Sequence, residues 1–200
     1  MSTAVASGIG HSDSPETESV RVPLLEELIA DSTGAGARVW ADLGCAQGGL
    51  VSRLQVGRNL LVVADLPEAF RKNRTQWHIP DAALEARFWR RPVDCFLCWE
   101  LLNYMRPDEL GELSRNFARR ASSRSKVHAL IEYSGTSMCD APGRYRLDVN
   151  GQLRAAKTAI DSVGTPRYTP KALEKSMPEL QVERTMLLNN GMQEFVFSLR

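Results

Sequence analysis

The stretch RVWADLGCAQGG, residues 38–49, joins a short apolar run to an acid and a glycine-rich turn. The run 38–44 predicts a strand, because it is apolar and ends at a glycine, and a helix is expected to start at Gly48 and reach Leu54. In a parallel sheet, such turns lie at the carboxyl ends of the strands, where ligands bind. Glycine at that place lets the backbone approach a ligand closely. The stretch therefore predicts a ligand site at one edge of a parallel sheet.

A second acid strengthens this prediction. Residues 59–66 form the next expected strand, and Asp65 lies near its end, 17 residues after Gly48. A carboxylate at this place can accept two hydrogen bonds from the hydroxyls of a ribose. Together the glycine turn and Asp65 predict a site for a cofactor that contains a nucleoside.

Strand and helix patterns alternate along the chain, which predicts a parallel sheet with helices on both faces. Turn residues at 189–191 and at Asn150-Gly151 each predict an antiparallel hairpin. The expected fold is a single-domain α/β three-layer αβα sandwich, whose mostly parallel seven-stranded sheet has an antiparallel C-terminal strand. The expected strands are 38–44, 59–66, 85–89, 93–99, 126–133, 180–188 and 192–199, and the expected helices are 22–31, 48–54, 67–77, 107–120 and 171–177.

Composition is typical of a single globular domain. The chain has 200 residues, of which 43% are hydrophobic and 24% are charged. Its 25 basic and 24 acidic residues give a net charge of +1, which argues against a main role in binding nucleic acid backbones. Arginine makes up 20 of the 25 basic residues, a bias that base composition alone can produce.

The N-terminal residues and the cysteines indicate the cellular compartment in which the protein is expected. Residues 1–19 are small, polar and patternless, so a disordered tail is expected before a domain at 20–200. No apolar run is long enough to span a bilayer, and residues 1–19 do not resemble a signal peptide. Cys95 and Cys98 lie within an apolar run, which indicates buried free thiols rather than a metal or redox pair. A cytoplasmic protein with no metal site is expected.

The residues of the turn favour one kind of cofactor. No G-x-G-x-x-G pattern can be drawn through Gly44, Gly48 and Gly49, which weakens a nicotinamide dinucleotide. Asp42 would repel a pyrophosphate, whereas it suits a cofactor that has a positively charged amino acid end.

These residues resemble the motifs of class I S-adenosylmethionine-dependent methyltransferases. The first motif of that family, acid-x-Gly-x-Gly-x-Gly, is read here as Asp42, Gly44, Ala46 and Gly48. Asp65 is similar to the acid of the second motif, residues 93–105 resemble the fourth motif, and 126–133 resemble the fifth strand. The two C-terminal strands are similar to the reversed final hairpin of the family. The departures are Ala46 in place of a glycine and a short stretch between Asp65 and Asp94, which has no acid near the expected adenine.

The resemblance implies S-adenosylmethionine as the cofactor and a role for each matched residue. Its methionine end would lie on the first motif, its ribose on Asp65, and its adenine against Phe88 or Trp89. The residues after the fourth strand, from Trp99 to Tyr104, would face the site of methyl transfer. Glu100 and Tyr104 are candidate catalytic residues; the candidate acceptor-binding residues are Asn103, Tyr104, Tyr133 and Arg144, and Trp99 is a further candidate for the cofactor site.

The reaction implied is transfer of a methyl group to an O, N or S nucleophile, with a small molecule as the expected acceptor. The sequence also leaves open a methyltransferase fold that has lost catalysis and acts in protein–protein interaction. The segment 134–169 is then either a lid over the acceptor or an arm of a homodimer. Trp99 and Tyr104 are equally compatible with core packing, and His128 is expected to be structural. The arginines at 115, 119, 120 and 124 are explained by the dipole of the helix at 107–120.

Overall fold

The computed structural model describes residues 19–34, 36–44, 49–54, 58–64, 66–67, 91–148, 150–156 and 161–200. The expected helix at 67–77 lies almost wholly outside these residues, and the expected strand at 85–89 and residues 1–18 of the expected tail lie outside them completely. Among the described residues, no helix is both long and apolar enough to cross a bilayer.

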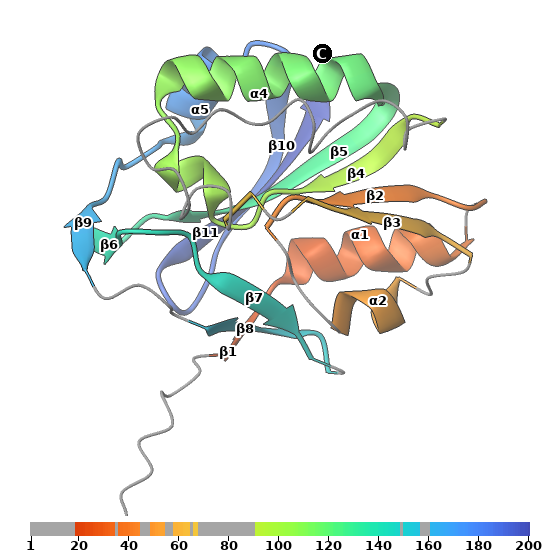
Figure 1. Ribbon diagram of the computed structural model, residues 1–200, viewed down its shortest axis with the longest axis horizontal. Coiled ribbons are helices and arrows are strands. Elements are labelled where there is room, and N and C mark those ends of the chain that lie inside the picture. Colours follow the sequence, from red (N-terminus) through yellow and green to blue (C-terminus); the bar gives the residue numbers. More distant parts are fainter. Residues whose placement is uncertain are drawn as a thin grey trace, which may run out of the picture.

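Among the described residues, a six-stranded sheet forms the centre of the molecule (Figure 1). The neighbouring strands β3, β2, β4 and β5 are parallel, whereas β11 runs antiparallel to both β5 and β10. This confirms a mostly parallel sheet with an antiparallel C-terminal strand. In sheet order, the strands are β10 (Leu180–Leu187), β11 (Met192–Leu199), β5 (Ala121–Glu132), β4 (Val93–Leu97), β2 (Val39–Asp42) and β3 (Leu60–Val63).

Helices cover both faces of this sheet. Figure 1 shows α4 and α5 on one side and α1 and α2 on the other. Two clusters of buried side chains match these sides: Phe96 packs with Leu110 and Phe117 in one, and Trp40 packs with Leu25 in the other. Alternate residues of each strand therefore enter opposite cores. The helices are α1 (Pro23–Gly34), α2 (Gly49–Arg53), α4 (Pro107–Arg120) and α5 (Pro170–Ser176), with a 3₁₀ turn η3 at Leu101–Tyr104.

Helix α4 has the bounds that its sequence pattern predicts. Pro107 stands at its first turn, where no backbone N–H is needed. The Glu109 carboxylate accepts a hydrogen bond of 2.7 Å from the backbone N–H of Arg106. Leu110 and Phe117 are fully buried on the face toward the sheet. Local signals thus account for the start and the buried face of this helix.

The segment after β5 forms two small sheets. Strand β6 (Ser137–Cys139) pairs with β9 (Ser162–Gly164), while β7 (Arg144–Leu147) and β8 (Gln152–Ala156) form the hairpin that Asn150-Gly151 predicts. Gly151 has a φ of 79°, as such a turn requires. Strand β1 (Ser19–Arg21) pairs with β8, which no local pattern predicts. Ser19, assigned to the tail from the sequence, is thus the first residue of a strand.

The β7–β8 hairpin is built into the core beside α1 and α2. Its side chains of Tyr145, Leu147 and Leu153 are buried and belong to the same cluster as Leu25 and Leu50. The hairpin is therefore part of the hydrophobic core on the face of the sheet that α1 and α2 cover.

A buried polar pair links the last strand to the first helix. The Glu194 carboxylate lies 2.8 Å from Nε2 of His128, and both side chains have no exposed surface. Glu194 also accepts hydrogen bonds from the backbone N–H groups of Leu25 (2.8 Å) and Leu24 (3.1 Å). These are unsatisfied donors at the start of α1, where the helix dipole favours a negative charge. His128 thus has the structural role that its mid-strand position suggests.

We expect Glu194→Ala to lower the free energy of unfolding by about 3–5 kcal/mol, because it leaves His128 and two buried N–H groups without a partner. Urea denaturation would measure the loss. The matched control is Glu183→Ala, which removes an ion pair with Lys126 that is partly exposed and is expected to cost at most about 1 kcal/mol. Equal losses in the two variants would contradict a special role for Glu194.

Candidate functional site

Asp42 and Gly44, singled out in the sequence, lie at the carboxyl end of β2. Asp42 is the last residue of the strand and is 1% exposed. Its backbone oxygen accepts from Ala64 (2.8 Å), and the next N–H, of Leu43, donates to Leu97 (2.9 Å). Asp42 is therefore held between β3 on one side and β4 on the other.

Trp99 joins the end of β4 to Asp42. Its indole Nε1 donates a hydrogen bond of 2.7 Å to Oδ1 of Asp42, and its side chain is buried. The same Oδ1 accepts from the backbone N–H of Gly44 at 3.1 Å. Trp99 has a φ of 51°, the only positive φ of a non-glycine residue in the described chain. A bulky residue rarely adopts this conformation, so the surrounding contacts hold a strained backbone here.

Gly44 makes room for this indole ring. A Cβ atom on Gly44 would lie 2.1 Å from Cδ1 of Trp99, a distance that real contacts do not reach. In the sequence, this glycine was expected to allow the approach of a ligand. The structure shows a different reason for a glycine at position 44. The atoms that lie against it belong to the side chain of Trp99.

Gly49, the first residue of α2, meets the hairpin in a similar way. A Cβ atom there would lie 1.4 Å from the backbone oxygen of Leu147 on β7. The hairpin backbone therefore lies directly against the start of α2, where the glycine-rich turn ends.

Tyr145 of β7 packs against Trp99. Its ring stacks on that of Trp99, with centroids 5.6 Å apart and planes 14° apart. Its burial, and then the neighbouring Glu100 carboxylate, raise the pKa of the Tyr145 hydroxyl. Sequence reasoning missed this residue. The only signal for it is the alternation in residues 144–147, which places Tyr145 and Leu147 on the same face of a strand.

The two candidate catalytic residues hold the inserted segment against the sheet. The Glu100 carboxylate accepts a hydrogen bond from the backbone N–H of Gly143. The Tyr104 hydroxyl lies 3.0 Å from the backbone oxygens of both Cys139 and Ala141. Burial, followed by the Glu100 carboxylate, raises the pKa of Tyr104 well above its usual range, so its hydroxyl stays protonated at neutral pH. Tyr104 is thus placed to hold the segment rather than to remove a proton.

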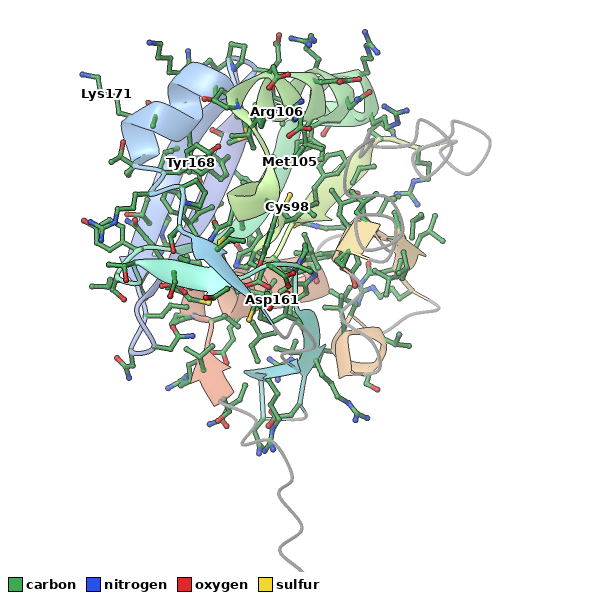
Figure 2. All side chains as sticks on the ribbon, turned by 60° about the vertical axis from the view of Figure 1, so that its left-hand side comes forward. Cys98, Met105, Arg106, Asp161, Tyr168 and Lys171 are labelled. Carbon is green, nitrogen blue, oxygen red and sulfur yellow. The ribbon has the colours of Figure 1, made fainter. Side chains whose placement is uncertain are left out.

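The other expected acceptor residues differ in their surroundings. Asn103 is 4% exposed, and its Nδ2 lies 3.8 Å from the sulfur of Met138, while its Oδ1 is buried without a partner. Tyr133, just after β5, is 49% exposed. Two residues after Asn103, the backbone oxygen of Met105 accepts a hydrogen bond of 2.5 Å from the Tyr168 hydroxyl (Figure 2). This contact joins the end of η3 to the segment before α5.

The structure thus brings together the ends of β2 and β4 with the hairpin. Asp42, Gly44, Trp99 and Glu100 lie there, together with Tyr145 of the hairpin. Within the ranges that the structure describes, no three His, Cys, Asp or Glu side chains are grouped as metal ligands. The expected cofactor residues Ala46, Gly48, Asp65, Phe88 and Trp89, and the side chain of Arg144, lie outside the described residues.

Comparison with known proteins identifies the fold. No protein-family model and no curated protein sequence matches the chain. Among solved structures, an S-adenosylmethionine-dependent methyltransferase from Clostridium acetobutylicum matches 88% of this chain and 89% of its own, with 13% identity and a TM-score of 0.53. The PH0226 protein from Pyrococcus horikoshii matches 89% of both chains, with 11% identity and a TM-score of 0.51. The chain therefore has the class I methyltransferase fold, as the sequence motifs predict.

We expect Gly44→Ala to lower the free energy of unfolding by about 1–3 kcal/mol, because the added methyl group displaces the Trp99 ring. Urea denaturation would measure the loss, and near-ultraviolet circular dichroism would report the changed packing of the indole. Gly36→Ala is the matched control, since a Cβ atom there meets nothing within 4 Å. A Gly44→Ala protein as stable as the control would show that the indole is not confined in this way.

Proposed function

We propose that the protein is an S-adenosylmethionine-dependent methyltransferase that transfers a methyl group to an O, N or S nucleophile of a small molecule. The observation that carries the proposal is the place of Asp42 and Trp99 in the sheet. The chain passes from β2 to β3 on one side and later returns to β4 on the other side, so the strand order reverses between β2 and β4. Open α/β sheets bind their ligands outside the carboxyl ends of the strands at such a reversal.

The residues at this point fit a cofactor that carries an ammonium and a sulfonium group. Asp42 is a buried carboxyl group beside Gly44, and a negative charge there would favour ammonium and sulfonium groups over phosphates. When bound, S-adenosylmethionine supplies a methyl group that is activated by its sulfonium. Asp42 and the glycine turn would hold the methionine end, and Asp65 would hold the ribose.

The remaining residues would act by positioning and by excluding water. The stacked rings of Trp99 and Tyr145 lie beside Asp42 and limit the access of water to its carboxylate. Glu100 and Tyr104 keep the inserted segment fixed over the edge of the sheet. Methyl transfer to a good nucleophile then depends mainly on orientation, and it needs no dedicated base.

A second function is favoured by the two glycines at the turn. Gly44 faces the indole of Trp99, and Gly49 faces the backbone of Leu147, so protein atoms fill the space at both. A chain that kept the fold but gave the cofactor space to its own side chains would act as an interaction module, alone or as a homodimer. Cofactor binding distinguishes this function from the first.

We propose that the protein is located in the cytoplasm, and its free thiols support this proposal. Cys95 and Cys98 are buried and unpaired, and burial raises the pKa of both thiols well above the usual range. Thiols of this kind are compatible with a reducing compartment.

We expect S-adenosylmethionine and S-adenosylhomocysteine to bind with micromolar dissociation constants in calorimetric titration, and Asp42→Asn to weaken binding about tenfold or more. This change keeps an oxygen for Trp99 and Gly44 but removes the negative charge. Asp108→Asn is the control, because it removes an exposed carboxylate at the start of α4 whose partner is Arg106. Absence of binding by the unchanged protein at about 1 mM cofactor would refute the proposal and favour the interaction module.

The ribose contact has its own test. We expect Asp65→Ala to abolish the micromolar binding, because it removes the acceptor for two hydroxyl groups. The same calorimetric titration measures the loss. Titrating the variant with S-adenosylhomocysteine as well shows whether the loss of affinity depends on the methyl group. Binding that survives this change would show that the ribose lies elsewhere.

A further inference from the structure

Two buried polar side-chain atoms near the inserted segment have no hydrogen-bond partner. They are Oδ1 of Asn103 and Oγ1 of Thr165, and no atom of the described chain bonds to either. Asn103 belongs to the 3₁₀ turn η3, which begins two residues after Trp99, and Thr165 directly follows β9. The other atoms of this kind in the described chain lie on strands of the central sheet, in Trp40, His128 and Gln193. Buried polar atoms nearly always have a partner, so the pair beside η3 needs an explanation.

The strand register places Thr165 on the face of the β6–β9 ribbon (residues 137–139 and 162–164) that meets η3. The sulfur of Met138 on β6 lies 3.8 Å from Nδ2 of Asn103, so this face of the ribbon lies against η3. Val163 of β9 pairs with Met138, and paired residues of antiparallel strands point to the same face. Thr165 is two residues further on, and its backbone N–H continues the ladder by donating to Thr136 at 3.2 Å. Both unpartnered atoms therefore lie in the layer between η3 and the ribbon.

Two tyrosine hydroxyls hold the ribbon to η3, one beyond each end of it. The hydroxyl of Tyr104 on η3 lies 3.0 Å from the backbone oxygens of Cys139 and Ala141, at the end of β6. The hydroxyl of Tyr168, which follows β9, donates to the backbone oxygen of Met105 at the end of η3 (Figure 2). Burial raises the pKa of both hydroxyls, so both stay protonated at neutral pH and can donate. These contacts fix the geometry of the layer and leave its two unpartnered atoms as they are.

The layer reaches the surface at Val163. This side chain shares the face of the ribbon with Met138, which is half-buried against η3, yet Val163 is 41% exposed. The face that η3 covers at one residue is thus open at its paired neighbour. A small molecule that enters beside Val163 comes directly to the two unpartnered atoms.

The chemistry of the two atoms defines the group that suits them. A thioether sulfur is a weak acceptor, so the amide nitrogen of Asn103 faces Met138 and the amide oxygen is left for a ligand. An amide oxygen only accepts, so its partner must carry an O–H or N–H. An ionised carboxylate and a thiolate have no such hydrogen. The Thr165 hydroxyl both donates and accepts, so it suits the oxygen or nitrogen of the same group.

We propose that Asn103 and Thr165 bind the methyl acceptor through a hydroxyl or amine group, so that the acceptors are alcohols, phenols or amines. This inference rests on the proposed function and narrows it, because thiolates and carboxylates are excluded. An O–H or N–H that donates to Asn103 leaves a lone pair of the same oxygen or nitrogen available for attack. Both residues are thus determinants of acceptor specificity, and Thr165 is one that no sequence motif indicates.

The stability of two variants tests whether the atoms are kept for a ligand. Asn103→Leu and Thr165→Val introduce apolar groups of similar shape, which is neutral or stabilising where a buried polar atom has no partner. The midpoint of urea denaturation of the unliganded protein is therefore expected to stay the same or rise. Asn59→Leu is the matched control, because this buried amide accepts from the backbone N–H of Arg38 (2.9 Å) and donates to the oxygen of Leu54 (2.7 Å). Its midpoint is expected to fall.

Titrations followed by nuclear magnetic resonance test the chemical class of the ligand. Phenol, aniline and benzoate are aromatic probes of similar size, of which only benzoate has no O–H or N–H at neutral pH. Phenol and aniline are expected to shift the side-chain amide signals of Asn103 with millimolar dissociation constants, with and without S-adenosylhomocysteine. Benzoate is expected to bind at least about tenfold more weakly. Thr165→Ser keeps the hydroxyl and should preserve binding, whereas Thr165→Val should weaken it about fivefold.

Three outcomes would overturn the proposal. A midpoint that falls in Asn103→Leu and Thr165→Val as far as in Asn59→Leu would show that the two atoms have a structural partner, such as a buried water. Equal affinity for benzoate and phenol would refute the chemical class, and phenol and aniline that leave the Asn103 signals unchanged would refute the site. Neither measurement needs S-adenosylmethionine, so failure of the proposed function, seen as absence of cofactor binding in calorimetry, is distinguished from failure of this inference.

Discussion

The hydrogen bond of 2.7 Å from the Trp99 indole to Asp42 is the contact on which the candidate site depends. It joins the ends of β2 and β4 at the point where the strand order reverses. A positive φ at Trp99 aims the ring at Asp42, and a glycine at position 44 leaves space for it. Tyr145 stacks on the same ring and joins the hairpin to it. One buried donor–acceptor pair thus positions three separate segments of the chain.

A second buried polar group lies beneath the first. The ring of His128 meets that of Trp99 edge to face, with centroids 6.1 Å apart, and its Nε2 contacts Glu194. Buried polar groups that are bonded to one another restrict a core to a single arrangement, because any other packing leaves one of them unpaired. The core on the side of α1 therefore combines apolar packing with two polar contacts that specify its geometry.

Much of this arrangement follows from local sequence. Pro107 and the spacing of Leu110 and Phe117 predict α4, and Asn150-Gly151 predicts the β7–β8 turn. The alternation of strands and helices predicts the parallel sheet, and Asp42 and Gly44 locate the site. Contacts between distant residues could not be predicted in this way. Strand β1 is three residues long and gains its identity only from β8. Tyr145 enters the site through tertiary packing.

The capping of α1 by Glu194 has a consequence for the order of folding. The donor Leu24 and the acceptor Glu194 are 170 residues apart, so the first helix receives its cap from the last strand. During synthesis, α1 leaves the ribosome long before this carboxylate exists. A native contact of such high sequence separation has a large entropic cost of loop closure and forms late. The N-terminal helix therefore reaches its final stability only when the C-terminal hairpin joins the sheet, which makes the folding of the two ends a single cooperative event.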